Sequence, residues 1–165
     1  MSETDVIIIG VGTSGEDLGL RLLGAGLDVV GIEASLVGGE CAYWACIPSK
    51  MMIRAGNAIS EARRVAQLAG DATVVPSWAP VAERIRTEAT SNWNDAFATE
   101  RFGQRGGRLI HGRGRLTGPR TVTVGDESIT ARIGVVIATG STPLIPPIPG
   151  VDEVDYWTTH DVIAA

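Results

Sequence analysis

The stretch Val6-Ile-Ile-Ile-Gly10-Val-Gly12-Thr-Ser-Gly15 decides the fold. Its β-branched run is typical of a strand that is buried on both faces, and the run ends at a glycine. A helical pattern follows over residues 14–23, and residues 29–32 have the composition of a second strand. The sequence therefore predicts a βαβ unit with a glycine-rich turn between its first strand and its helix.

The glycines of this turn match the dinucleotide-binding pattern Gly-x-Gly-x-x-Gly. Gly10 permits the tight turn, Gly12 lets the backbone approach a pyrophosphate, and Gly15 lets the helix pack closely against the strand. Backbone amides at the start of the helix, at Thr13 and Ser14, then face the phosphates. The pattern predicts a nucleotide site, with a ligand-free glycine turn as the alternative.

Glu33 stands at the end of the second predicted strand. A carboxylate at this place accepts hydrogen bonds from ribose hydroxyls. It also repels a 2′-phosphate, so the adenosine of FAD or NAD fits better than that of NADP.

Downstream patterns complete an α/β fold. A helix is expected over residues 51–69 and a second helical region over residues 81–102, with doubtful continuity at Asn92-Trp93-Asn94. Strands are expected at residues 109–110, 121–124, 128–131 and 135–137, with a turn at Gly125-Asp126. We expect a Rossmann-like domain with a parallel sheet, a helical insertion and a small antiparallel β-meander.

Charge and hydropathy exclude two classes of partner. The net charge is −5 and the arginines are scattered, so no basic stripe is available to follow a nucleic acid. Residues 1–5 are acidic where a secretory signal is basic, and the apolar run 6–9 is too short to span a membrane. We therefore expect a cytoplasmic protein without nucleic-acid or membrane partners.

The second motif is Gly38-Gly-Glu-Cys41-Ala-Tyr-Trp-Ala-Cys46-Ile-Pro-Ser-Lys50. If a helix starts at the glycines, Cys41 lies in its first turn, where a thiolate is stabilised. Positions five apart in a regular helix are separated by about 8.7 Å between Cα atoms, whereas a disulfide needs roughly 4.4 to 6.8 Å. A bridge to Cys46 therefore requires a distorted turn, which makes it easier to reduce. Lys50, the only lysine among 14 basic residues, could tune a flavin or a thiolate by its charge.

Taken in order, these motifs resemble the pyridine nucleotide-disulfide oxidoreductase family. Cys-Ile-Pro-Ser-Lys is most similar to the branch of dihydrolipoamide dehydrogenase and mercuric reductase, and Gly112-Arg-Gly114 and Ile137-Ala-Thr-Gly-Ser141 match two further flavin-contacting segments of the family. The resemblance implies an FAD-binding domain over residues 1–165.

The resemblance also implies roles for single residues. Cys46 is the thiol stacked on the flavin, Cys41 is the interchange thiol that attacks substrate, and Lys50 lies near the isoalloxazine. These three are the expected catalytic residues, and no metal ligand is expected. The cofactor contacts implied by the fingerprint and the resemblance together are Gly10, Gly12, Thr13, Ser14, Gly15, Glu33, Gly39, Glu40, Cys41, Cys46, Lys50, Arg113, Ala138, Thr139 and Gly140.

In the complete family architecture, NAD(P)H reduces FAD, the flavin reduces the disulfide, and the electrons pass to a disulfide, a metal ion or a quinone. The second fingerprint for the nicotinamide and the interface domain that forms a homodimer and supplies a histidine do not appear in this sequence. We therefore expect the N-terminal portion of a larger architecture. His111 is expected at a strand end and His160 beside a helix cap, in solvent.

The sequence departs from the family pattern between and beside the thiols. Tyr43-Trp44 replaces smaller residues, Ala45 replaces a glycine, and Glu40 replaces a threonine or serine. Three alternatives stay open: an NAD-binding module with inert cysteines, a non-catalytic remnant without flavin, and a zinc-binding interaction domain that uses both cysteines and both histidines.

Overall fold

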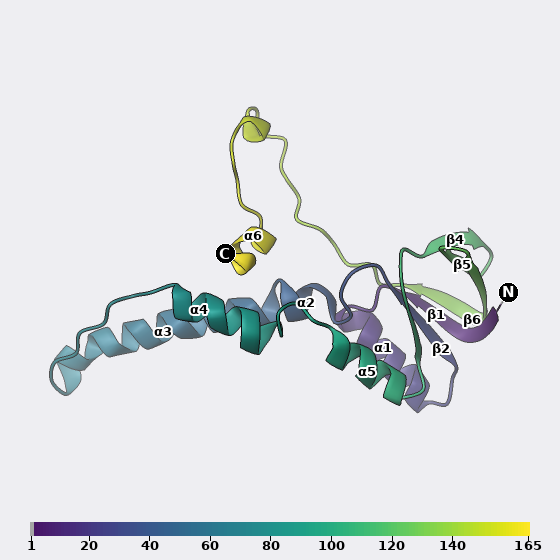
Figure 1. Ribbon diagram of the computed structural model, residues 1–165, viewed down its shortest axis with the longest axis horizontal. Coiled ribbons are helices and arrows are strands. Elements are labelled where there is room, and N and C mark those ends of the chain that lie inside the picture. Colours follow the sequence, from purple (N-terminus) through teal and green to yellow (C-terminus); the bar gives the residue numbers. More distant parts are fainter. Residues whose placement is uncertain (1) are drawn as a thin grey trace. The chain divides into compact units, whose positions relative to one another are not determined.

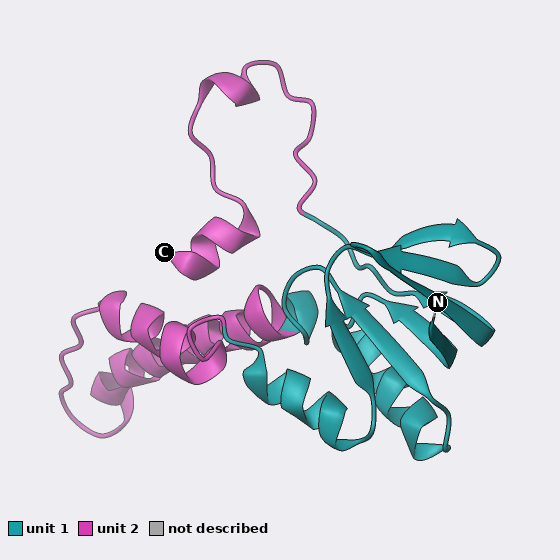
Figure 2. Ribbon diagram, turned by 45° about the vertical axis from the view of Figure 1, so that its right-hand side comes forward, with its two compact units in different colours: residues 1–41, 94–142 teal, residues 42–93, 143–165 magenta. Residues whose placement is uncertain are grey.

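The computed structural model describes residues 2–165 and divides into two compact units (Figure 2). Unit 1 comprises the chain up to Cys41 together with Asn94–Thr142. Unit 2 comprises Ala42–Trp93 and Pro143–Ala165. The chain passes from unit 1 into unit 2 directly after the first cysteine.

Unit 1 is built on one mixed sheet (Figure 1). Its strands are β1 (Ser2–Ile9), β2 (Val29–Glu33), β3 (Arg108–His111), β4 (Arg115–Gly118), β5 (Thr121–Val124) and β6 (Glu127–Ile137), in the spatial order β3-β2-β1-β6-β5-β4. The four strands β3, β2, β1 and β6 are parallel, and β5 and β4 continue the sheet as an antiparallel meander. The predicted α/β fold, with its parallel sheet and its meander, is confirmed.

The isoleucine run of β1 lies at the centre because both of its faces are covered. Ile8 packs with Phe102 on the face that carries α1 (Thr13–Gly24) and α5 (Ala96–Gln104). Ile7 packs with Val122 of the meander on the opposite face. All three of these isoleucine and phenylalanine side chains are fully buried. The unbroken apolar run thus reflects burial on two sides, as expected for a parallel strand.

One strand prediction was wrong, because residues 128–131 and 135–137 belong to the single strand β6. Its pairing with β1 shifts register between Thr4 and Val6. There β6 has two residues, Arg132 and Ile133, where β1 has one. A β-bulge of this kind interrupts the alternation of apolar residues without ending the strand. The expected turn at Gly125-Asp126 is confirmed between β5 and β6, whereas β4, fully exposed, was not predicted.

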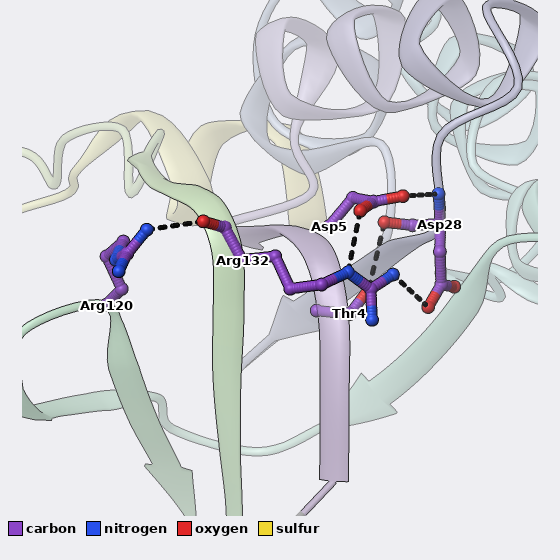
Figure 3. Close-up of polar contacts among 5 residues, drawn as sticks. All are labelled: Thr4, Asp5, Asp28, Arg120 and Arg132. Carbon is purple, nitrogen blue, oxygen red and sulfur yellow. Dashed lines mark hydrogen bonds and ion pairs between the residues drawn. The ribbon is translucent and has the colours of Figure 1, made fainter.

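Figure 3 shows the polar clasp that fixes this bulge. The Arg132 guanidinium donates to the Asp5 carboxylate at 2.9 Å and lies 4.0 Å from that of Asp28. The backbone N–H of Asp28 donates to Asp5, and the Thr4 hydroxyl donates to the carbonyl of Asp28, both at 2.9 Å. Arg120 donates to the carbonyl of Arg132. The clasp links Arg132 of β6 to Asp5 of β1 and to Asp28, the residue before β2.

Unit 2 is helical. Its main elements are α3 (Cys46–Leu68), α4 (Ala79–Arg84), the π-helix η1 (Ile85–Ala89), the 3-10 turn η2 (Val151–Glu153) and α6 (Thr159–Ala164); α2 (Gly39–Tyr43) lies across the boundary with unit 1. The stretch formed by α4 and η1 packs along α3 (Figure 1). No helix within residues 2–165 is both long enough and apolar enough to cross a membrane.

Two helix predictions need correction. The helix expected over residues 51–69 begins five residues earlier, at Cys46. The region 81–102 is not one helix, because Ser91, Asn92 and Trp93 adopt left-handed backbone angles with φ of 50°, 58° and 54°. The doubt about continuity at this point is confirmed. The helix cap expected beside His160 is also confirmed, since Thr158 and Asp161 form a capping box on α6.

Candidate functional site

The carboxyl ends of the four parallel strands meet at one edge of unit 1. Gly10 donates its backbone N–H to Ile32 of β2, and Ala138 donates to Ile9 of β1, both at 2.8 Å. Gly112 donates to the carbonyl of Glu33 at 2.8 Å. The three segments predicted to contact a cofactor, after β1, β3 and β6, are therefore neighbours at this edge, which is where open α/β sheets bind ligands.

The three glycines of the first turn differ in the space around them. A Cβ on Gly10, which has φ +93°, would lie 2.3 Å from the carbonyl oxygen of Ala138, and one on Gly15 would lie 2.0 Å from that of Gly10. Both glycines are thus required by packing. A Cβ on Gly12 would meet only the Cα of Gly39, at 3.6 Å. Packing within the protein therefore does not require a glycine at position 12, and the absence of a side chain there leaves an open space beside the turn.

Glu33 organises the turn as well as facing the edge. One carboxylate oxygen accepts from the backbone N–H of Val11 at 2.6 Å, and the other accepts from Ser35 at 2.8 Å. Each carboxylate oxygen has a second lone pair that can accept from a ribose hydroxyl. The predicted ribose contact and this structural role are compatible.

A second glycine pair meets the first turn. Gly38 forms a β-bridge with Gly12, donates its N–H to Val11 at 2.8 Å and accepts from the Thr13 hydroxyl at 3.4 Å. Gly39 has φ +62°, and a Cβ there would lie 2.8 Å from the Cα of Gly12. Gly38 was not among the predicted cofactor contacts. The adjacent glycines 38 and 39 were the sequence signal for this close approach of two backbones.

Cys41 and Cys46 are joined as a disulfide. The helix breaks between them, since α2 ends at Tyr43, and Ala45 has φ −139° and ψ −89° before α3 begins. Pro48 accounts for the break, because a proline in a continuous helix clashes with the carbonyl four residues earlier, here that of Trp44. The distorted turn that a bridge between these positions requires is present. The disulfide fits a redox-active bridge.

The remaining predicted residues lie on exposed surface. Lys50 lies one turn after Cys46 on α3, and Glu40 lies in the first turn of α2; both are exposed. Arg113, Thr139 and Gly140 are exposed in the segments that follow β3 and β6. Their contacts with a cofactor stay predictions, as do those of the glycine turn.

The two histidines differ in their surroundings, and one of them belongs to a group of aromatic rings. His111 lies exposed at the end of β3, as expected. His160 lies beside the cap of α6, as expected, but the prediction that it lies in solvent was wrong, because its ring stacks on Trp44 with centroids 4.4 Å apart and planes inclined by 17°. Trp44 also contacts Trp93, at 5.3 Å. No single-sequence signal joins three rings so distant along the chain. Among residues 2–165, no group of three or more potential metal ligands lies together.

Comparisons with known proteins agree on one family. The model of the family described as pyridine nucleotide-disulphide oxidoreductase matches residues 4–164. Mercuric reductase of Serratia marcescens is 29% identical over 97% of this chain and 36% of its own length. Mercuric reductase of Bacillus cereus is 32% identical over 96% of this chain and 25% of its own length. Dihydrolipoyl dehydrogenase 2, chloroplastic, of Arabidopsis thaliana is 31% identical over 86% of this chain and 25% of its own length.

A solved structure supports the fold. The copper(II) complex of the HOCl-induced flavoprotein disulfide reductase RclA from Escherichia coli superposes with a TM-score of 0.75 at 21% identity. The match covers 98% of this chain and 34% of that one. The chain thus spans between 25% and 36% of the length of the relatives named here.

Proposed function

Because the chain belongs to the pyridine nucleotide-disulphide oxidoreductase family, we propose that it binds FAD at the carboxyl edge of unit 1 and uses Cys41–Cys46 as its redox-active disulfide. The observation that carries the proposal is the segment beginning at Gly38. Its glycines touch the nucleotide turn at Gly12, and two residues after Gly39 it carries the first cysteine of the bridge. One short segment thereby serves both the cofactor site and the disulfide.

The residues present fit the pyrophosphate and ribose of FAD. The open space at Gly12 admits a phosphate, and the amides of Thr13 and Ser14 at the start of α1 are available to donate to it. Glu33 receives the adenosine ribose, while Arg113 and the segment Ala138-Thr139-Gly140 contact the rest of the cofactor. Bound FAD supplies two-electron transfer between NAD(P)H and a disulfide.

The protein's own chemistry is thiol–disulfide exchange. Two electrons and two protons open the Cys41–Cys46 bridge to two thiols. The Cys41 thiolate attacks the acceptor, and for a disulfide acceptor it forms a mixed disulfide and expels one acceptor thiol. The Cys46 thiolate then attacks Cys41, which re-forms the bridge and releases the second acceptor thiol. Lys50 places a fixed positive charge one turn from Cys46.

The acceptor is a disulfide, a metal ion or a quinone, and a soft metal ion is favoured. The relatives named mercuric reductases support this choice, because thiolates are soft ligands. The whole chain serves as the FAD-binding portion of a cytoplasmic enzyme. The nicotinamide-binding domain and the dimer-forming domain belong to the remainder of the architecture, and the chain's 25% to 36% share of its relatives supports this division.

The variant Gly12→Ala tests the cofactor site. Its methyl group meets protein atoms only at 3.6 Å, so the chain folds, but it occupies the space in which the phosphate lies. We expect FAD affinity, measured by quenching of flavin fluorescence, to fall at least about tenfold, which is roughly 1.4 kcal/mol. Gly24→Ala, at the other end of the helix that follows Gly12 and with no atom within 4 Å of its Cβ, is the matched control and keeps wild-type affinity. Equal FAD affinity of wild type and Gly12→Ala contradicts the site, and binding of NADH in place of FAD supports the NAD-binding module.

A further inference from the structure

Trp44 lies inside the loop that the disulfide closes and contacts two other rings of unit 2. The His160 ring stacks on it with centroids 4.4 Å apart, and the Trp93 ring lies at 5.3 Å with an inclination of 31°. His160 belongs to α6 and Trp93 to the turn after η1. We call Trp44, Trp93 and His160 the aromatic cluster. It joins the disulfide loop to the last helix of unit 2.

Three contacts between α6 and other parts of unit 2 can be named from the described residues. Residues 143–150, which lead toward it, are all exposed. The helix itself is held by the ring stack of His160, by the burial of Ile163, and by the Trp78 indole N–H, which donates to the carbonyl of Ala165 at 2.9 Å. A movement of Trp44 therefore acts directly on one of the contacts that hold α6 in place.

The conformation of the turn that carries Trp93, the third ring of the cluster, is unfavourable in free energy. Trp93 and the two residues before it adopt left-handed angles, a conformation that costs free energy for residues other than glycine. The turn is fixed by Arg86, whose carbonyl accepts from the Asn92 N–H at 2.6 Å, and by the buried Thr90 hydroxyl, which accepts from the Trp93 N–H at 3.4 Å.

The indole N–H of Trp93 adds a second cost. It is buried, and it has no acceptor among the described residues. Strain and an unsatisfied donor of this kind persist where the surroundings over-determine the conformation, and they concentrate at functional and switch regions.

We propose that the aromatic cluster couples the redox state of Cys41–Cys46 to the docking of α6. The bridge closes a six-residue loop and restricts where Trp44 can lie, while the helix break at Ala45 leaves the open loop free to move. When a dithiol reduces the bridge, the S–S bond breaks, two S–H groups form, and the dithiol becomes a disulfide. The Trp44 ring then leaves the His160 ring, and α6 loosens.

Thermodynamic linkage makes the coupling reciprocal. If oxidation favours the stacked state by a given factor, stacking favours the oxidised bridge by the same factor. We expect a factor of roughly ten, inside the range of about 5 to 150 that is usual for coupled sites. Loss of the stack should then raise the reduction potential of the bridge by about 30 mV, since a tenfold change in a two-electron equilibrium is 29.6 mV.

The test uses proton NMR of the flavin-free chain, so it is independent of the proposed FAD site. The chain has two histidines. The stacked indole ring moves the chemical shifts of the His160 ring protons away from the values of an unfolded chain, which are called their unstructured positions below. On addition of dithiothreitol, we expect the resonances of His160 to move toward those positions. His111, exposed at the end of β3, is the internal control and should not move.

The variants His160→Ala and His160→Phe test the reciprocal effect in dithiothreitol redox buffers. His160→Ala should be reduced about tenfold more readily than wild type, and His160→Phe, which keeps a flat ring, should restore the wild-type equilibrium. Trp44→Leu should place the His160 resonances at their unstructured positions even in the oxidised chain. Immobile His160 resonances on reduction, or equal redox equilibria of wild type and His160→Ala, overturn the proposal.

Discussion

Unit 1 and unit 2 use different means to position the groups proposed to act. At the edge of unit 1, backbone positions the turn, because Gly10, Gly15 and Gly38 allow main chains to approach closely. In unit 2, aromatic side chains contact Trp44 of the disulfide loop, and the three rings come from distant points of the sequence. Sites made of backbone depend on glycine spacing, whereas sites made of side chains depend on long-range folding.

The largest expected effect tests the packing that supports the backbone-made edge. Phe102 is fully buried between α5 and the sheet, and Phe102→Ala should lower the free energy of unfolding by about 3–5 kcal/mol. Phe97→Ala, on the same helix with a side chain 76% exposed, should change it by less than about 0.5 kcal/mol. Urea unfolding measures both, and similar losses for the two variants would contradict the assigned core.

The next effect tests whether glycine is required by packing. A methyl group on Gly15 meets a backbone oxygen that cannot move aside, so Gly15→Ala should cost about 3 kcal/mol of unfolding free energy. Gly24→Ala near the end of the same helix has free space and should raise stability by about 0.5–1 kcal/mol. A wild-type unfolding midpoint for Gly15→Ala would show that the turn is not packed as described.

The smallest expected effect on stability concerns the clasp around Asp5 and Arg132, which lies away from the carboxyl edge of the sheet. The Arg132 guanidinium, and then the backbone N–H of Asp28, hold the pKa of the Asp5 carboxyl below its ordinary value. The contribution of Asp5 is therefore complete above its unfolded pKa, near 3.9, and is lost as the pH falls through the lower folded value. Asp5→Asn should flatten the acid side of the stability profile.

Arg132→Gln checks the cause of that pH dependence. It removes the first partner of Asp5, so it should flatten the same part of the profile, and the double variant should add little to either single change. Additive effects of the two substitutions on thermal unfolding below pH 4 would show that Asp5 and Arg132 act separately.

The sequence predicted the backbone-made part of the molecule well. The glycine turn, both strands of the βαβ unit and the β5–β6 hairpin follow from local patterns, and the family resemblance is confirmed by the match over residues 4–164. β6 was divided in two because the bulge near Arg132 interrupts the apolar alternation. The late start predicted for α3 missed Cys46, since a proline in the first helical turn resembles a helix breaker in sequence.

The side-chain contacts of the aromatic cluster could largely not be predicted from the sequence. His160 was predicted to lie in solvent because its neighbours Thr158 and Asp161 indicate only a helix cap. Its stacking partner Trp44 lies more than a hundred residues earlier, and no local pattern relates the two. The left-handed turn that places Trp93 was visible only as doubtful helix continuity at Asn92.

The visible absorption spectrum of the chain with FAD, recorded before and after anaerobic addition of a dithiol, tests the central claim most directly. We predict stoichiometric flavin uptake and a long-wavelength band on reduction, which persists in Cys41→Ser and disappears in Cys46→Ser. Flavin uptake with a band that survives in Cys46→Ser would contradict the assignment of the two thiols. A folded chain that takes up no flavin would contradict the proposed cofactor site itself.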